Sequence, residues 1–499
     1  MKDYQIKQML GGEYAQLDKN FEKYALIRDD LLKGLSDVDR SCIIINAPRG
    51  SGKSGLLITH SQAVKLSSPT RNIVITRYWM DVRYPNTVID LEQAIAFWRR
   101  QILEWMIVEI GSRIDPPKTE DEVVAVEFAE RARRKSKLSI AKPSAANLDD
   151  IPDEALVGII EESGFDFWLL LDEMDDHFTT EPRTTNRIAG LLEACKVRAQ
   201  MPNVYIRLAI RPHVMTYLRT RYDHIQQLRS SEMNLNWTPQ QLKQILAKRI
   251  DYFEEKNGLQ QFDLLEENHE LDDPKGVMQT LGRYFADFDM SFAEDHTSRY
   301  RAFHTVSLGR PRWMLEFCAL ALAQADGNHA GNAEFKKAMH IFGSNRIQFL
   351  AGEHRAMVPD LEAIVNNLAG ERSIVFHSSK KLERAIERQV LGLDDEQMTK
   401  PDRESVEKSR EIAQILFMLE IIRARQGDKR NYRHITYTER PSLLSSWNAE
   451  PNIRWEIHPT FQRALNIIDN QTYRVGSEIR TFGERATSDE EGEGFTEDV

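Results

Sequence analysis

The chain has 499 residues, of which 41% are hydrophobic, with a formal net charge of −11 and a mean hydropathy of −0.50. This length exceeds that of a usual single domain, and the acidic balance argues against a protein that coats nucleic acid with its whole surface. No stretch approaches the roughly 18 apolar residues of a membrane helix, and the first ten residues lack an apolar signal core. We therefore expect a cytoplasmic protein of several domains without a membrane partner.

The three cysteines are Cys42, Cys195 and Cys318. They stand in apolar or helical surroundings and have no paired spacing. This usage favours buried thiols in a reducing compartment over a disulfide framework or a zinc site.

Residues 1–40 form a charged leader with helical periodicity, since Phe21, Tyr24, Ile27 and Leu31 recur at helical spacing. An apolar stripe of this kind needs a surface to bury it. We expect the leader to pack on the domain that follows.

The strongest motif lies at the start of that domain, which we expect to span residues 41–240. Residues 42–45 are a cysteine and three β-branched isoleucines, a run typical of a buried strand, and the run is followed by a glycine-containing loop with Gly-Lys-Ser and then by a helix. Strand, loop and helix in this order predict a phosphate-binding P-loop, although Ala47 stands where the usual pattern has its first glycine. The expected nucleotide-binding residues are Pro48, Arg49, Gly50, Ser51, Gly52, Lys53, Ser54 and Gly55.

Each residue type has a physical role in such a loop. Gly50 and Gly52 allow the backbone to curl around a phosphate, and the helix amino terminus adds partial positive charge. We expect Lys53 to contact the β- and γ-phosphates of a nucleotide and the Ser54 hydroxyl to bind Mg²⁺.

A second motif is the apolar strand at residues 167–171, which ends in Asp172 and Glu173. Ligands of open α/β sheets bind at the carboxyl ends of the strands. We expect Asp172 to hold the Mg²⁺ shell and Glu173 to orient and polarise the attacking water. Asp175 and Asp176 are expected to be helix-entry or solvated charges.

Three further strands complete the expected sheet: residues 72–79, residues 203–210 and a short strand within residues 226–237. Arg211 follows the second of these strands, so its guanidinium is expected to sense the γ-phosphate. Residues 113–150 form a charged insertion with a basic cluster at residues 131–137, for which an exposed helix is the simplest interpretation.

The remaining chain is expected to hold three regions. Residues 241–350 are helical and contain Arg310 and Pro311 before an apolar helix, so Arg310 or Arg312 could reach the nucleotide from a lid domain. Residues 351–470 have helices followed by strand-like segments, a pattern typical of a winged helix, with Lys429, Arg430, Arg433 and His434 as a candidate basic wing. Residues 471–499 are polar and then acidic, which predicts a disordered tail.

The order of P-loop, LLLDE, strand-Arg, GRPR and winged helix resembles the STAND and Orc-like branch of AAA+ ATPases over about residues 40–470. The resemblance implies an α/β fold with a parallel-sheet P-loop core, and ATP or ADP with Mg²⁺ as ligands. It also implies that Arg211 is a sensor arginine, that Gly309 and Pro311 match the lid motif near the adenine, and that His458 contacts the β-phosphate in a closed state. Similar bacterial STAND-like ATPases often belong to phage-defence or stress-response systems.

Three functions remain open, of which the first is the leading hypothesis because the acidic balance of the chain favours it. The first is an ATP-driven switch whose nucleotide state controls homo-oligomerisation or engagement of a separate effector protein. The second is an AAA+ ATPase that loads on or remodels DNA, in which the winged helix contacts the duplex and an arginine from a neighbouring subunit completes the site; Arg187, Arg198, Arg219 and Arg221 are the candidates. The third is a nucleotide-binding scaffold with little turnover, against which the intact Asp172–Glu173 pair argues.

Overall fold

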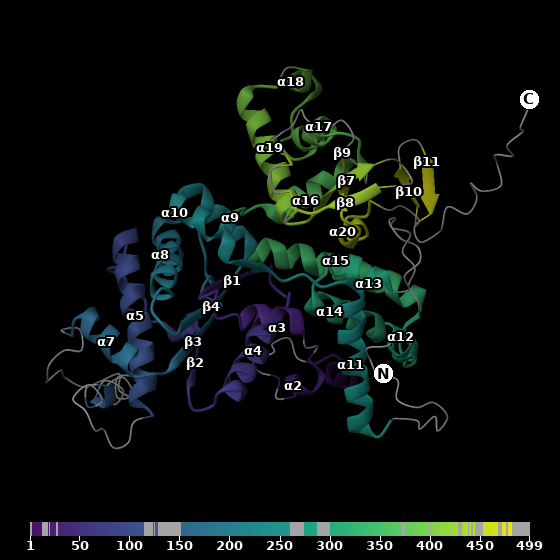
Figure 1. Cartoon of the computed structure of the whole chain (residues 1–499). Coiled ribbons are helices and arrows are strands. Elements are labelled where there is room, and N and C mark those ends of the chain that lie inside the picture. Colours follow the sequence, from purple (N-terminus) through teal and green to yellow (C-terminus); the bar gives the residue numbers. More distant parts are fainter. Residues whose placement is uncertain are drawn as a thin grey trace, which may run out of the picture. The chain divides into compact units, whose positions relative to one another are not determined.

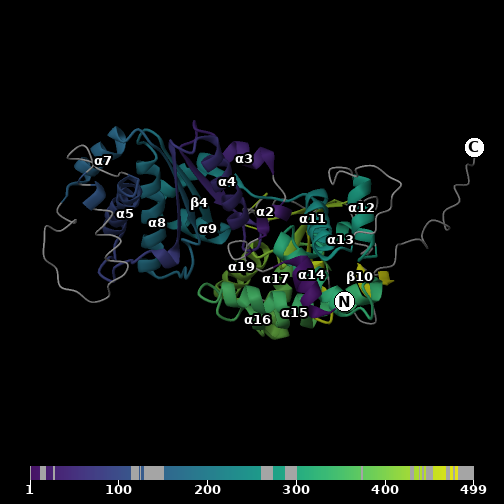
Figure 2. The ribbon, with the colours of Figure 1, turned by 90° about the horizontal axis from the view of Figure 1, so that it is seen from below.

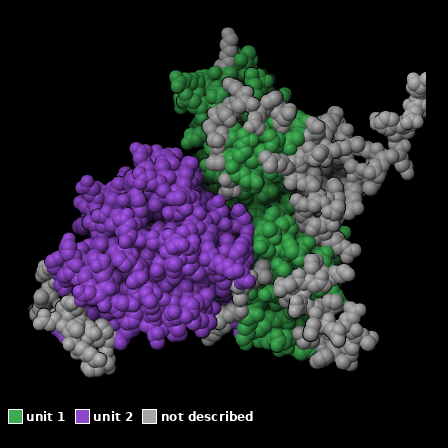
Figure 3. Space-filling view, viewed as in Figure 1, with its two compact units in different colours: residues 1–14, 23–26, 237–499 green, residues 15–22, 27–236 purple. Residues whose placement is uncertain are grey.

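The computed structural model describes residues 2–11, 18, 20–25, 28–113, 123, 125–127, 151–259, 274–286, 300–371, 375–399, 401–427, 432–437, 439–440, 443–444, 453–467, 472–475 and 478–481. The chain divides into two compact units, coloured separately in Figure 3. Unit 1 contains Met1–Tyr14, Lys23–Leu26 and Trp237–Val499, and unit 2 contains Ala15–Glu22 and Ile27–Asn236.

Unit 2 is built on a five-stranded sheet with the order β2-β3-β4-β1-β5, in which every paired strand is parallel. Parallel pairing brings the carboxyl ends of all the strands to one edge of the sheet. All five strands predicted from the sequence are confirmed: β1 (Cys42–Asn46), β2 (Asn72–Tyr78), β3 (Asp166–Asp172), β4 (Val204–Ile210) and β5 (Glu232–Asn234).

Helices cover both faces of this sheet. Figure 2 shows α4 on one side of the strands and α5 with α8 on the other, and Figure 1 shows α5 and α8 side by side. Burial on both faces explains why β3 is a continuous apolar run, with its residues from Phe167 to Leu171 at most 5% exposed. The helices of unit 2 are α3 (Asp29–Leu35), α4 (Lys53–Ser67), α5 (Leu91–Gly111), α7 (Asp153–Glu162), α8 (Pro182–Arg198), α9 (Pro212–Arg221) and α10 (Asp223–Gln226).

A buried arginine joins the leader to the sheet. Arg207, in the middle of β4, is fully buried, and its guanidinium donates hydrogen bonds to the carbonyl oxygens of Leu35 (2.6 Å), Asp37 (3.0 Å) and Arg40 (2.9 Å). These carbonyls follow α3 or close it, so the arginine caps the leader helix from inside the sheet.

The leader also contacts the P-loop helix. A Cβ placed on Gly55 in α4 would lie 2.7 Å from Cζ of Phe21, so the glycine makes room for this ring. Tyr24, three residues later, belongs to unit 1, where its ring lies 5.5 Å from that of Tyr252. The leader thus packs on the P-loop domain at Phe21, as predicted, whereas Tyr24 packs within unit 1.

Unit 1 begins with helices, as predicted for residues 241–350. The amino-terminal helix α1 (Asp3–Leu10) places Ile6, Met9 and Leu10 in the same apolar core as α11 and α14. Thr238 caps α11 by accepting a hydrogen bond from the Gln241 N–H. The other helices are α11 (Pro239–Asn257), α12 (Pro274–Gly282), α13 (Arg301–Val306), α14 (Pro311–Ala323) and α15 (Asn332–Glu353).

The carboxyl-terminal part of unit 1 is winged-helix-like. An antiparallel sheet with the order β6-β9-β7-β8 is accompanied by α16, α17 and α19, labelled together in Figure 1. Its elements are α16 (Leu361–Leu368), β6 (Val375–Phe376), α17 (Ser379–Gln389), α18 (Asp395–Thr399), α19 (Arg403–Met418), β7 (Ile422–Gly427), β8 (Tyr432–Ile435), β9 (Ile453–Ile457) and α20 (Pro459–Gln462).

The predicted basic wing is described only in part. Lys429 and Arg430 lie outside the described residues, and Arg433 lies in β8. His434 is paired with the buried carboxylate of Glu456, 3.2 Å away, so its side chain faces the sheet. The prediction that His434 belongs to an exposed basic wing is therefore wrong.

Two further sequence predictions concern the carboxyl-terminal tail and the insertion at 113–150, which the structure describes only in part. Within the predicted disordered tail, β10 (Thr472–Val475) and β11 (Glu478–Thr481) pair as an antiparallel hairpin, so the prediction is wrong for these strands, while residues 482–499 lie outside the described residues. Most of the insertion at 113–150, including its basic cluster, also lies outside them. Within the described part of the chain, no helix has the length and apolar character needed to span a membrane.

Candidate nucleotide-binding site

The P-loop connects the end of β1 to the start of α4. Gly50 and Gly52 have φ angles of 86° and 91°, in the left-handed region that favours glycine, and Gly52 is the N-cap of α4. A loop with residues in this conformation, followed by a helix amino terminus, is an arrangement that directs backbone N–H groups at an anion. The predicted strand, loop and helix are all present.

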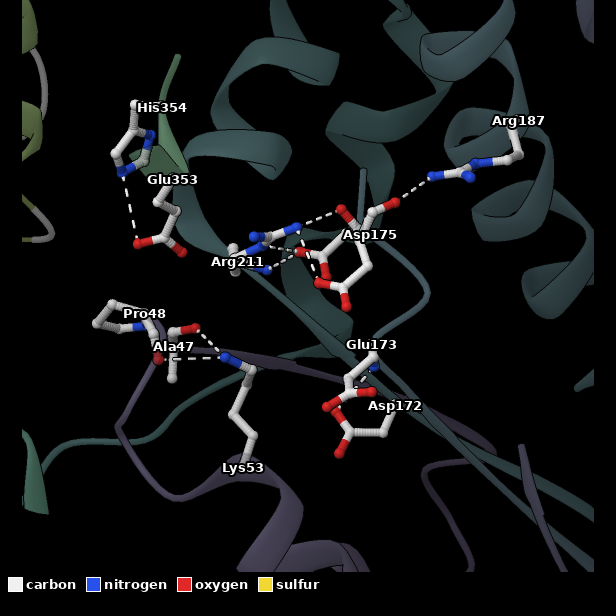
Figure 4. A network of polar contacts seen from close by, with 11 residues as sticks. Ala47, Pro48, Lys53, Asp172, Glu173, Asp175, Arg187, Arg211, Glu353 and His354 are labelled. Atoms are coloured by element: carbon white, nitrogen blue, oxygen red, sulfur yellow. Dashed lines mark hydrogen bonds and ion pairs between the residues drawn. The ribbon is translucent and has the colours of Figure 1, made fainter. Parts of the chain in front are cut away.

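The lysine of the loop closes over its own backbone. Nζ of Lys53 donates to the carbonyl oxygens of Ala47 (2.7 Å) and Pro48 (3.1 Å), as Figure 4 shows. These bonds hold the ammonium group above the loop. Ala47, the departure from the usual motif, is buried and its N–H donates to the Ile210 carbonyl, so the alanine fits between β1 and β4 without strain.

Asp172 ends β3 at the same edge of the sheet and is 2% exposed. Its Oδ1 accepts a hydrogen bond from the Glu173 N–H (2.9 Å), whereas its buried Oδ2 has no hydrogen-bond partner among the described residues. Burial raises the pKa of Asp172, and the Ser54 hydroxyl and the Lys53 ammonium act in the opposite direction. An unpaired buried carboxylate oxygen is costly unless a cation compensates it.

The residues at this position suit Mg²⁺. Mg²⁺ prefers oxygen ligands and binds proteins through one or two carboxylates together with phosphate groups. Asp172 offers a carboxylate oxygen. Ser54, whose hydroxyl acts to lower the pKa of that carboxylate, offers a second oxygen. These two residues would hold the ion, which would supply charge neutralisation for the phosphates.

Glu173 has a backbone conformation rare for its residue type. Its φ of 57° is left-handed, which costs a residue with a side chain roughly 1–2 kcal/mol. Its side chain is half-buried and lies beside that of Asp172 in Figure 4. Strain of this kind persists where the surrounding structure enforces it, often at functional sites.

Arg211 lies at the tip of β4 as predicted, but its side chain is already engaged. Its backbone N–H and its Nε both donate to Oδ2 of Asp175, at 2.7 and 2.9 Å, and Nη2 also bonds the Asp175 carbonyl (Figure 4). Asp175 is 3% exposed. The expectation that Asp175 is a helix-entry or solvated charge is therefore wrong, because it neutralises a buried arginine.

Four arginines were candidates for completing a neighbour's site, and three are engaged within unit 2. Arg187 is buried, lies 3.7 Å from the Trp79 ring centre and donates to the Asp176 carbonyl; burial lowers its pKa to about 10. Arg198 is paired with Asp153, and Arg219 with Glu232. Arg221 is exposed, beside the Tyr217 ring.

The remaining candidates lie in unit 1. Arg310 is 5% exposed, with its guanidinium 4.1 Å from the Trp313 ring centre and 4.0 Å from Glu420. Pro311 is the first residue of α14, as predicted. His458 is fully buried, its Nδ1 accepts the Thr460 N–H, and burial holds its pKa well below the ordinary value, so it is neutral.

Two residues of the site were missed in the sequence. Asp175 is the buried partner of Arg211, and Tyr78 lies opposite Asp172 in the β2–β3 register. Burial, together with the charges of Asp172 and Glu173, raises the pKa of Tyr78. The only sequence signal for Tyr78 was its place at the end of a predicted strand.

No family model matches the chain, and no curated protein matches its sequence. Among solved structures, it is similar to the Aeropyrum pernix ORC2 protein in ADPNP–ADP complexes (11% identity, 92% of this chain and 97% of that chain, TM-score 0.42). It is also similar to the ADP form of that protein (12%, 93% and 97%, 0.34) and to Cdc6p from Pyrobaculum aerophilum (12%, 92% and 96%, 0.29). At these values, the α/β parallel-sheet fold rests on the observed strand order and the P-loop, not on the likeness.

Proposed function

We propose that the chain is an Mg²⁺-dependent ATPase of the P-loop class. The observation that carries this proposal is the buried Oδ2 of Asp172, which has no hydrogen-bond partner among the described residues. The Ser54 hydroxyl and the Lys53 ammonium both act to lower the pKa of this carboxylate. A carboxylate, a hydroxyl and an ammonium group at the end of a P-loop sheet match the requirements of a metal-bound nucleoside triphosphate.

Each residue has a role in this proposal. The N–H groups of residues 49–55 and the ammonium of Lys53 bind phosphates, with Pro48 shaping the loop before them, and Ser54 with Asp172 holds the metal ion. Glu173 orients the attacking water and accepts its proton. Arg211 senses the γ-phosphate through the guanidinium that Asp175 holds in place.

The test is nucleotide binding and steady-state hydrolysis by the full chain. Glu173→Gln should lower kcat by at least about 100-fold, the range for loss of a general base, and leave ATP affinity within a few-fold of the parent. Lys53→Ala should lower affinity itself. The matched control is Glu181→Gln, an identical change at an exposed residue of the same unit.

Normal hydrolysis by Glu173→Gln would refute the role of Glu173, and normal nucleotide binding by Lys53→Ala would refute the P-loop assignment. The choice of ATP over GTP rests on the resemblance of the motif order. Both nucleotides therefore belong in the assay.

As the biological role, we place a DNA-associated ATPase ahead of a nucleotide switch. The winged-helix-like region of unit 1 favours it, because modules of this kind serve as DNA readers. In a homo-oligomer, Arg221 is the best candidate to complete a neighbour's site, since a residue acting in trans must be exposed.

The roles of a switch, a separate effector protein and phage defence gain nothing from the similar structures, which are ORC2 and Cdc6p proteins. These roles remain predictions from the sequence. Nucleotide-dependent assembly without DNA, measured by light scattering, would favour the switch over the DNA-associated role.

A further inference from the structure

The helix α17 (Ser379–Gln389) has an unusual division of charge between its two faces. Its exposed side chains are Lys380, Lys381, Arg384 and Arg388, so every one of them is cationic. Its two carboxylates, Glu383 and Glu387, are buried, at 8% and 2% exposure.

Neighbouring residues explain why the carboxylates turn inwards. Glu383 forms an ion pair with Arg410 of α19 at 3.1 Å, and Ser409 of the same helix hydrogen-bonds Glu387. The apolar residues Leu382 and Ile386 are fully buried on this inner face. The acidic groups therefore do not neutralise the outer face.

The four cations lie on one face of the helix. At 100° per residue they fall within an arc of about 100°, and Lys380, Arg384 and Arg388 are separated by about 6 Å per step along the axis. Arg388 is paired with the exposed Asp395 at 3.6 Å, so the strongest part of the row is Lys380, Lys381 and Arg384.

The helix α19 (Arg403–Met418) has a different surface. Its six exposed side chains are three cations and three carboxylates: Arg403, Lys408, Arg410, Glu404, Glu407 and Glu411. Two of the arginines are already paired, with Glu407 and with Glu383. In a helix-turn-helix the second of two packed helices enters the major groove, and here that position belongs to the charge-balanced α19.

We propose that the outer face of α17 binds the phosphate backbone of duplex DNA. The inference rests on the DNA-associated role proposed for the chain and names the surface that performs it. Duplex DNA presents a charge about every 1.7 Å of its axis, which complements an uninterrupted row of cations.

Other partners fit this surface less well. A membrane-bound helix inserts an exposed apolar face, and the apolar residues of α17 are buried against α19. Protein interfaces have an apolar or aromatic centre, and α17 exposes neither kind of side chain.

The experiment measures binding of a fluorescein-labelled 30-base-pair duplex by anisotropy, with the full chain at several KCl concentrations. The variant is Lys380→Gln/Lys381→Gln/Arg384→Gln. The control is Arg403→Gln/Lys408→Gln/Arg410→Gln, which removes the same number of charges from α19. The charge-conserving Lys380→Arg/Lys381→Arg/Arg384→Lys variant tests whether charge alone suffices.

We expect the α17 variant to weaken binding by at least about tenfold and to reduce the slope of log K against log salt by about 2–3, as for two or three lost phosphate contacts. The α19 variant should stay within about threefold of the parent, and the charge-conserving variant should bind normally.

Equal losses in both triple variants, or an unchanged α17 variant, would overturn the proposal. So would a parent chain that does not bind DNA at 50 mM KCl, including one that binds vesicles of anionic lipid instead. ATP hydrolysis by the same preparations reports separately on the P-loop. DNA binding can thus fail while hydrolysis persists, and the reverse.

Discussion

Oδ2 of Asp175 accepts two hydrogen bonds from Arg211, one from the backbone N–H and one from Nε, at 2.7 and 2.9 Å. One carboxylate oxygen therefore fixes both the start of α9 and the direction of the arginine side chain. Both residues are buried. Removing one partner of such a pair leaves a buried charge without compensation.

Asp175→Asn should accordingly lower the free energy of unfolding by about 3 kcal/mol, the usual cost of breaking a buried pair. Asp176→Asn is the matched control, because the Asp176 side chain is 43% exposed and lies 3.5 Å from the same guanidinium. That change should cost less than about 1 kcal/mol. Urea denaturation followed by tryptophan fluorescence measures both, and equal losses would contradict the assigned asymmetry.

The carboxylate of Asp172 should give the free protein a measurable pH dependence. Burial raises its folded pKa above the ordinary 3.8, so the folded state binds more protons than the unfolded state between these two values. Stability of the free protein therefore falls as the pH rises through this window. Asp172→Asn removes this contribution, so its stability relative to the parent should increase with pH.

Thermal unfolding from pH 4 to 8 without nucleotide measures this difference. With Mg²⁺ and ATP present, the parent should instead be more stable than Asp172→Asn. The ionised carboxylate is the form that binds the metal, and ligand binding stabilises the folded state. A difference between variant and parent that does not change with pH would count against a raised pKa.

The close approach of Phe21 to Gly55 predicts that Gly55→Ala destabilises unit 2. The new methyl group would lie 2.7 Å from Cζ of the ring, and overpacking of this kind costs typically 1–3 kcal/mol. Adding Phe21→Leu should recover part of the loss. In contrast, Gly158→Ala in α7, where a Cβ meets nothing within 4 Å, should stabilise by up to about 1 kcal/mol. Denaturation of the parent and these three variants decides this, and a neutral Gly55→Ala would show that the ring moves freely.

Arg207→Met should be among the most damaging single changes in unit 2. It leaves the carbonyl oxygens of Leu35, Asp37 and Arg40 without this donor, and unsatisfied buried groups cost about 1–3 kcal/mol each. Arg71→Met is the comparison, since the Arg71 side chain is 59% exposed in its pair with Asp166 and should contribute less than about 1 kcal/mol. Similar midpoints of denaturation for the two variants would remove Arg207 from its capping role.

The P-loop and the Asp172–Glu173 pair could be predicted because their signals are local. A β-branched strand, a glycine loop and a helix start occupy adjacent residues, and the strand before Asp172 is apolar throughout. The order of the five strands follows from pairing between distant segments, which one sequence does not display.

The Asp175–Arg211 pair could not be predicted for the same reason, because 36 residues separate its members. The division of charge between the two faces of α17 could not be predicted either. Its sequence mixes basic and acidic residues in a pattern typical of a solvated helix. Only the packing of α19 decides that Glu383 and Glu387 turn inwards and that the lysines and arginines remain outside.

The division of the chain between its two units has a consequence for limited proteolysis. Residues 1–14 belong to unit 1, whose main part begins at Trp237, while the P-loop sheet lies between them in the sequence. A single nick between Asn236 and Trp237 would therefore not set two independent fragments free. The amino-terminal fragment would stay attached through α1, whose Ile6, Met9 and Leu10 are buried in a core made by the other fragment. The nicked protein should elute from a sizing column as one particle and separate only in denaturant.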